Sequence, residues 1–129
     1  MDALDDRRRH VRFALEPMYS HVVVRRVDAP DHTIEGHAYD ISGGGVRFEL
    51  DEAISPGLRV LIRIDLPQTA TERSTERRSI YAFANIVWLE DDDPFGPCQM
   101  AAVFTEFARP SDEAMLQSRL CSGRYSVAA

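Results

Sequence analysis

Alternation of apolar and polar residues with a period of two is the feature that most limits how this chain can fold. Successive side chains of a β-strand point to opposite faces, so this period predicts strands with one buried face. It recurs in residues 59–66, where one face holds Val60, Ile62, Ile64 and Leu66. Residues 80–89 repeat it, with one face formed by Ile80, Ala82, Ala84, Ile86 and Trp88. Both segments are predicted strands, and Trp88 is expected on the apolar face.

Shorter signals extend this strand pattern over most of the chain. Residues 20–27 contain a run of β-branched side chains, and the Pro- and Asp-rich residues 28–32 form a turn. Residues 33–42 should then return as the hairpin partner. Residues 46–50 alternate apolar with charged side chains, and residues 99–104 complete the set of predicted strands. Residues 67–78 are polar throughout and are expected to form a long exposed hairpin loop.

A single helix is predicted near the carboxyl end of the chain. Ser111 is a candidate capping hydroxyl, and Asp112 and Glu113 suit the positive end of the helix dipole. The buried face would contain Met115, Leu116 and Leu120. Gly123 is a plausible stop, and the residues after it are expected to fray.

About six short strands followed by one helix predict an all-β fold with a C-terminal α-helix. The strands would form a six-stranded antiparallel β-barrel, which protects its own edges by closing. We expect one domain with four parts. These are a flexible Arg-rich arm (residues 1–13), the barrel (14–109), the helix (110–123) and a tail (124–129).

Composition excludes several classes of protein. The chain has 129 residues, 44% of them hydrophobic, which suits one compact domain. No apolar run approaches the roughly 20 residues that cross a bilayer, so membrane insertion is not expected. No secretory signal is visible, so we expect a cytoplasmic location. Cys98 and Cys121 form no CxxC pair. A net charge of −6 argues against binding a nucleic-acid polymer.

Two clusters about thirty residues apart carry the functional signal. The first contains Arg7, Arg8, Arg9 and Arg12, and the second contains Asp40, Ser42, Gly44 and Gly45. Arginine pairs with phosphate or with the O6/N7 edge of guanine, whereas an ionised Asp accepts hydrogen bonds from guanine N1–H and N2–H₂. A site that held both types would grip the phosphate and the base of a small guanine nucleotide.

Arg8-x-x-x-Arg12 followed by Asp40-x-Ser42-x-x-Gly45 resembles the paired signature of PilZ domains, bacterial receptors for cyclic di-GMP. The stretches 84–88 and 100–107 are also similar to later strands of that family. The resemblance implies that Arg8 and Arg12 contact phosphate and guanine, with Arg9 as a third contact. It also implies a role for Arg7, because an Arg at that position favours binding of a stacked pair of ligand molecules.

On the barrel side, Asp40 and Ser42 should project from one sheet face while Ile41 turns into the core. We expect Asp40 to be an exposed strand carboxylate that contributes little to stability. Gly45 would permit an unusual backbone conformation or a close ligand approach, and Gly43 and Gly44 would make the turn more pliable. The ligand would be cyclic di-GMP, without a further cofactor, and the signal would pass to a protein partner in trans.

Other functions remain open from the residues alone. The chain could be a degenerate PilZ-like adaptor that binds only protein, and the Asp40–Gly43 segment could be an ordinary Ser or Asx turn. No catalytic residues are assigned, because the sequence has no GxSxG or HExxH motif and Ser42 has no identifiable base. His37 and Asp40 alone would make a poor metal site, so no metal is expected.

Overall fold

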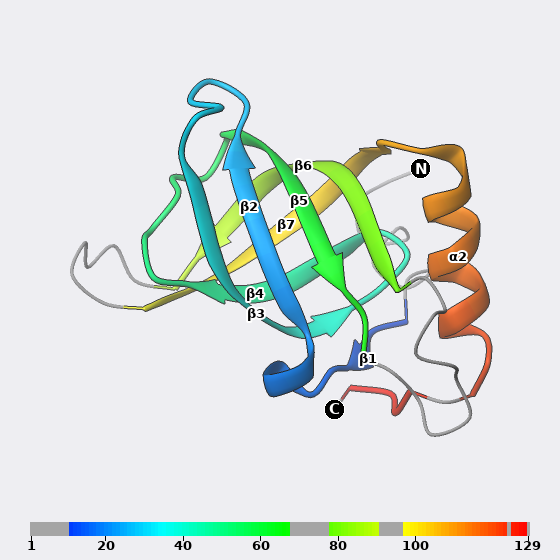
Figure 1. The fold of residues 1–129 in the computed structure, drawn as a ribbon. Coiled ribbons are helices and arrows are strands. Elements are labelled where there is room, and N and C mark those ends of the chain that lie inside the picture. Colours follow the sequence, from blue (N-terminus) through cyan, green and yellow to red (C-terminus); the bar gives the residue numbers. More distant parts are fainter. Residues whose placement is uncertain (1–10, 68–77, 91–96, 124, 129) are drawn as a thin grey trace, which may run out of the picture.

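The computed structural model describes residues 11–67, 78–90, 97–123 and 125–128. A two-residue strand and a short 3-10 helix come first, namely β1 (Phe13–Ala14) and η1 (Pro17–Tyr19). The longer elements are β2 (His21–Arg26), β3 (Thr33–Ile41), β4 (Gly45–Leu50), β5 (Arg59–Asp65), β6 (Ser79–Leu89), β7 (Cys98–Phe107) and α2 (Pro110–Leu120). Figure 1 shows the strands wound into a barrel with α2 at one end.

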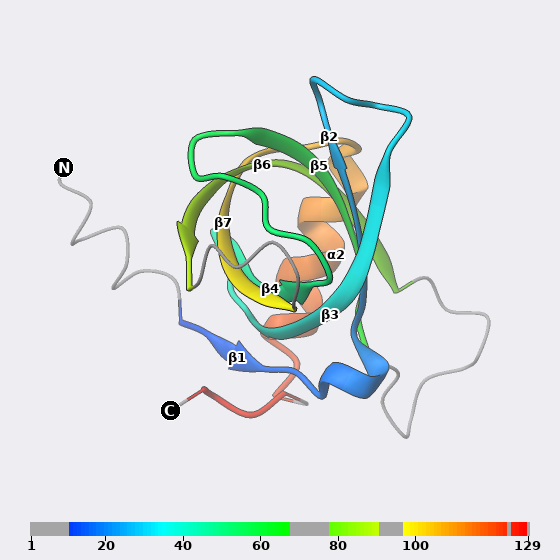
Figure 2. The ribbon, with the colours of Figure 1, turned by 90° about the vertical axis from the view of Figure 1, so that its left-hand side faces the viewer.

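The barrel has six antiparallel strands in the order β3, β2, β5, β6, β7 and β4, and the pairing of β3 with β4 closes it. Figure 2 looks along the barrel and shows the strands as a ring with α2 behind it. The predicted six-stranded antiparallel barrel with one C-terminal helix is therefore confirmed. Because the sheet closes on itself, its long strands leave no free edge.

The core follows the period of two that the sequence shows. In β5 the side chains of Val60, Ile62 and Ile64 are fully buried, as are those of Ile80, Ala82 and Ala84 in β6. The connection between β4 and β5 crosses one end of the barrel and buries Ile54. At the other end, α2 contributes Leu116 and Leu120 to the same core.

Trp88 is the exception to this alternation, and its predicted burial is wrong. The register between β6 and β7 shifts between Ile86 and Trp88, so the extra residue Val87 reverses the direction of the side chains that follow. Trp88 is consequently 44% exposed. A bulge cannot be seen in a pattern of residue types alone, which is why the sequence placed this ring in the core.

The helix begins and ends at slightly different residues than expected. Pro110 occupies its first turn and Arg109 is the N-cap residue, so Ser111 lies inside the helix rather than at the cap. Asp112 is fully buried and accepts hydrogen bonds from the Tyr81 backbone N–H and from Arg109 Nε, each at 3.0 Å. The helix stops at Leu120, before Gly123, whose φ of 77° fits the turn after it.

The prediction that the residues after Gly123 fray is wrong for residues 125–128. The Ala14 N–H donates to Ser126 O (2.7 Å), and the Ala128 N–H donates to Arg12 O (2.9 Å). An antiparallel bridge joins Phe13 to Val127. Residues 125–128 thus lie beside β1, as both views show. Backbone pairing, which does not depend on side-chain type, holds this short segment beside β1.

Other strand predictions agree with the structure. The 33–42 return strand pairs with β2, and β4 buries Val46, Phe48 and Leu50. β7 is longer than predicted at both ends. The Leu66 N–H donates to Arg78 O (2.9 Å), so β5 and β6 form a hairpin, although residues 68–77 of the expected loop lie outside the described residues. Among the described helices, none has the length and apolar character needed to span a membrane.

Candidate functional site

Asp40 lies near the end of β3 and is only 4% exposed. It pairs in register with Arg47 of β4, and Arg47 Nε donates to Asp40 Oδ2 at 2.8 Å. Arg47 alternates with the buried Val46 and Phe48, so this ion pair is on the outer face of the barrel. The expectation of an exposed Asp40 carboxylate is wrong, because Asp40 is buried and paired with Arg47.

Arg47 is held in place by two more side chains. Its guanidinium carbon is 5.7 Å from the centre of the Tyr39 ring, and its Nη1 donates to Gln99 Oε1 at 3.4 Å. The Tyr39 hydroxyl in turn donates to the Glu49 carboxylate. This hydrogen bond raises the pKa of Tyr39, and partial burial raises it further. Arg47 therefore has a fixed orientation above Asp40.

Ser42 follows the last residue of β3 and forms a tight turn. Its backbone N–H donates to Gly45 O (2.9 Å), and its Oγ accepts from the N–H groups of Gly44 (3.1 Å) and Gly45 (3.2 Å). This is the Ser turn that the sequence left open as a structural explanation. Ser42 is 6% exposed, and these two hydrogen bonds leave its hydroxyl proton free to be donated.

Gly45 has a structural reason to lack a side chain. A Cβ built at this position would lie 2.5 Å from the carbonyl oxygen of Ala102 in β7. Positive φ angles occur at Gly57 and Gly123 in the described residues, so Gly45 needs close backbone approach rather than an unusual conformation. The neighbouring Gly44 carbonyl accepts from the Phe104 N–H (2.9 Å). Both glycines thus connect β4 to β7.

Arg12 lies beside the second cluster because β1 pairs with the end of β3. Phe13 is opposite Ile41 and Ala14 is opposite Asp40. Continuing this antiparallel register by one residue places Arg12 opposite Ser42. Arg12 is exposed. The structure thus brings one residue of the first cluster to the second, whereas Arg7, Arg8 and Arg9 lie outside the described residues.

The same outer surface continues across two more strands to Trp88. Arg47 is opposite Ala101 of β7, and Ala101 is opposite Trp88 of β6. We call Asp40, Arg47, Ala101 and Trp88 the outer row. It crosses four adjacent strands, or about 14 Å at the usual strand spacing. The small Ala101 lies between a guanidinium and a partly exposed indole, two groups that stack well on planar rings.

Sequence reasoning missed Arg47 and Trp88 as site residues. Arg47 had a signal, since it is the outward residue of a clearly alternating strand that follows directly after the Ser42 turn. Trp88 had none, because its exposure depends on the bulge. His37 is opposite Glu49, away from any cluster of ligands, and within the described ranges no group of three His, Cys, Asp or Glu side chains could hold a metal.

Comparison with known proteins identifies the class. The family model for the PilZ domain matches residues 6–120, so the chain belongs to the PilZ domain family, which includes receptors for cyclic di-GMP. A search of curated protein sequences found no match. The family assignment therefore depends on the domain model and on the fold rather than on one close relative.

Solved structures show the same fold at low sequence identity. The chain resembles the PilZ domain of YcgR from Escherichia coli with c-di-GMP, with 19% identity, a TM-score of 0.63 and 90% of each chain covered. It also resembles the Bacillus subtilis inhibitor of motility MotI/DgrA, with 22% identity, a TM-score of 0.60 and 89% of this chain covered. The K. pneumonia MrkH–c-di-GMP complex is similar as well, with 16% identity, a TM-score of 0.64 and 88% of this chain covered. This chain spans 52% and 49% of the lengths of those last two proteins.

Proposed function

We propose that this PilZ domain is a receptor for cyclic di-GMP that signals to a protein partner. The observation that supports the proposal is the pairing of β1 with β3, because Phe13 and Ala14, which follow Arg12, lie opposite Ile41 and Asp40. Two short motifs far apart in sequence then act as one site. Family membership and two similar structures that were solved with c-di-GMP support the choice of ligand.

Each group has a chemical role in this proposal. Arg12 and the Ser42 hydroxyl donate to phosphate oxygens, and Arg47 presents guanidinium N–H groups to the O6/N7 edge of a guanine. One oxygen of Asp40 already accepts from Arg47, so its other oxygen would accept from guanine N1–H and N2–H₂. Trp88 would stack on a base lying over Ala101. Backbone near Gly44 and Gly45 would approach the ligand without side-chain obstruction.

Arg7, Arg8 and Arg9 would close over the bound nucleotide from the arm. Ordering such a segment costs conformational entropy, which charge-assisted hydrogen bonds to the phosphates must offset. The bound and free states would differ mainly in this arm, and a partner that recognises the closed arm would detect the ligand. Arg7 would favour a stacked pair of ligand molecules through an additional guanidinium.

A second function, a protein adaptor that binds no nucleotide, is favoured by one observation. Asp40 and Ser42 already have intramolecular partners in Arg47 and in the turn amides, so both residues have structural roles without a ligand. A direct measurement of cyclic di-GMP binding distinguishes the two functions.

Isothermal titration calorimetry with cyclic di-GMP and cyclic di-AMP tests the proposal. We expect binding of cyclic di-GMP and far weaker binding of cyclic di-AMP, whose adenine offers a different donor pattern to Asp40 and Arg47. Arg8→Ala or Arg12→Ala should each weaken binding roughly ten- to a hundredfold, since a charge-assisted bond contributes about 1.5–3 kcal/mol.

Arg26→Ala is the matched control, because Arg26 pairs with Asp28 at the far end of β2. It should leave the affinity for cyclic di-GMP unchanged. Trp88 fluorescence should change on titration in the wild type, and the nucleotide should be recovered intact because a receptor does not turn it over. Absence of binding would instead support the adaptor function, and equal affinity for both dinucleotides would refute the roles of Asp40 and Arg47.

A further inference from the structure

A second surface lies on the outer face of β5 and β6, on a different wall of the barrel. A strand face in contact with water normally carries polar residues, yet Leu61, Tyr81 and Phe83 project outward here and are only half-buried. Leu61 is opposite Phe83, and Arg63 is opposite Tyr81. Apolar and cationic side chains on the two strands are therefore neighbours and form one contiguous patch.

Two arginines stack on the rings of this patch. The Arg59 guanidinium carbon is 4.7 Å from the centre of the Phe83 ring, and that of Arg109 is 4.7 Å from the centre of Tyr81. A guanidinium that stacks through its flat face keeps its in-plane N–H groups available. Those groups match the geometry of a carboxylate, which binds arginine with two parallel hydrogen bonds.

Two of the arginines around this surface have no salt bridge within the described residues. Arg63 pairs with Asp65 (3.0 Å) and Arg109 pairs with Asp112 (3.0 Å). Arg25 is opposite Leu61. Both Arg25 and Arg59 are exposed, and neither makes a salt bridge to a residue that the structure describes. Two arginines without a salt bridge to a described residue thus lie beside the half-buried Leu61 and Phe83, and the exposed Glu106 of β7 is opposite Phe83.

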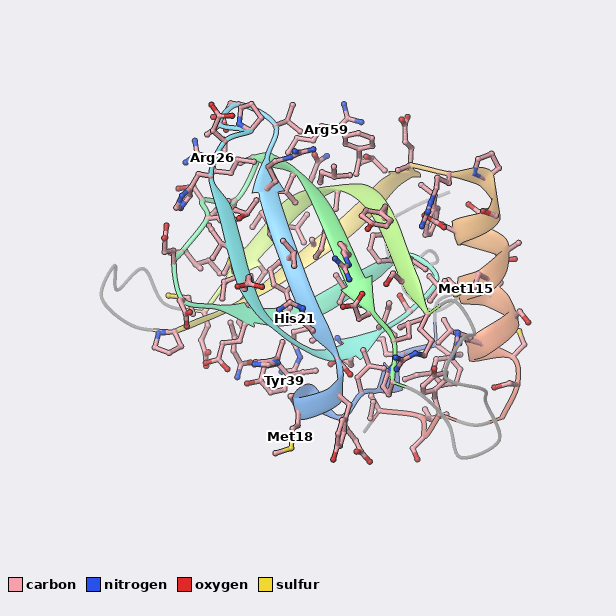
Figure 3. All side chains as sticks on the ribbon, in the orientation of Figure 1. Met18, His21, Arg26, Tyr39, Arg59 and Met115 are labelled. Carbon is pink, nitrogen blue, oxygen red and sulfur yellow. The ribbon has the colours of Figure 1, made fainter. Side chains whose placement is uncertain are left out.

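The position of this surface leaves it accessible. We call it the arginine-aromatic face (Arg25, Arg59, Leu61, Tyr81 and Phe83). In the strand order, β5 and β6 are opposite β3 and β4, which carry Asp40 and Arg47. Figure 1 shows the outer side of β2 and β5 without a helix across it, and Figure 3 shows Arg59 at the top of that wall. A partner here would not compete with a nucleotide at the outer row.

We propose that the arginine-aromatic face binds an extended acidic segment of a partner protein. Carboxylates of the segment would pair with Arg25 and Arg59, and an apolar side chain between them would cover Leu61 and Phe83. A nucleic acid fits less well, because two arginines neutralise few phosphates of a long polyanion, whereas they match the carboxylates of a short acidic segment one to one. The proposal does not require the chain to bind cyclic di-GMP, so the two can fail separately.

Fluorescence anisotropy with a defined probe tests this proposal. The probe is a short labelled peptide in which glutamates alternate with leucine and phenylalanine, and the control peptide has serine at the apolar positions. The full-length wild type should bind the probe and bind the serine peptide more weakly. Arg25→Glu or Arg59→Glu should each weaken binding about tenfold or more, the loss expected for one charge-assisted contact.

Arg26→Glu is the matched control, since it makes the same charge change in the neighbouring residue, whose guanidinium pairs with Asp28. It should alter probe affinity little, and saturation with cyclic di-GMP should not displace the probe. Equal losses in all three variants would show a general charge effect and overturn the proposal. Failure to bind the probe, equal binding of the serine peptide, or tighter binding of a labelled oligothymidylate would overturn it as well.

Discussion

At the scale of single residues, the ion pair between Asp40 and Arg47 does most to define the candidate site. Asp40 is buried under Arg47, so a change at Asp40 affects both the orientation of Arg47 and the direct contact with a base. Asp40→Asn keeps an acceptor for Arg47 Nε, whereas Asp40→Ala leaves that N–H without its partner. Affinity data on Asp40 variants therefore need a parallel measurement of stability.

The Tyr39–Glu49 hydrogen bond gives a prediction at the same scale. Because the pKa of Tyr39 is raised in the folded protein, the contribution of this bond to stability is complete below the unfolded-state pKa of about 10. It is lost as the pH rises through the folded-state value. Glu49→Gln removes the carboxylate charge and should lower the pKa of Tyr39.

An ultraviolet absorbance titration checks this prediction, with Tyr39→Phe identifying the signal among the four tyrosines. The wild type should contain one tyrosine that ionises at a higher pH than an exposed tyrosine. Tyr39→Phe should remove that late step. An unchanged late step in Glu49→Gln would contradict the assignment of Glu49 as the main cause.

At the scale of elements, the close approach of the paired strands β4 and β7 at Gly45 leads to a second prediction. Gly45→Ala would place a Cβ against the Ala102 carbonyl, so the strands must separate or shift. We expect a loss of about 1–3 kcal/mol in the free energy of unfolding, as is usual for overpacking. Urea denaturation checks this value. A variant as stable as the wild type would show that β4 and β7 are not as close as the structure places them.

The pairing of β1 with residues 125–128 gives a third prediction. Deleting residues 124–129 removes the acceptor of the Ala14 N–H and the donor to Arg12 O. The loss should be roughly 1 kcal/mol per hydrogen bond, and the Ala14 amide should exchange with solvent much faster. Hydrogen exchange followed by NMR checks this, with the Ile86 amide, which donates to Leu58 O, as the internal control. Unchanged exchange at Ala14 would contradict the pairing.

The elements also show which parts of the fold the sequence could predict. Period-two alternation predicts β4, β5 and most of β6, because a strand with one buried face carries apolar side chains at every second position. It cannot predict the Val87 bulge or the order of residues 125–128, since both depend on backbone register and hydrogen bonding. The two motifs predict Asp40, Ser42 and Arg12 as neighbours, whereas the covering of Asp40 by Arg47 follows only from strand pairing.

At the scale of the whole molecule, the closed barrel keeps two surfaces apart on a rigid frame. The outer row and Arg12 occupy the wall formed by β3, β4, β7 and the bulged end of β6, and the arginine-aromatic face lies around β5. In the two proposals, the nucleotide binds one of these surfaces and the partner protein binds the other, so both could be bound at once.

The central claim is that the arginine cluster and the Asp40 cluster form one site for cyclic di-GMP. The most direct test is the melting temperature with and without the nucleotide, for the full chain and for a chain that lacks residues 1–10 and carries Arg12→Ala. A ligand that binds only the folded state raises the melting temperature. We predict that the two proteins melt at nearly the same temperature without ligand and that cyclic di-GMP stabilises the full chain alone. Equal stabilisation of both would contradict the claim.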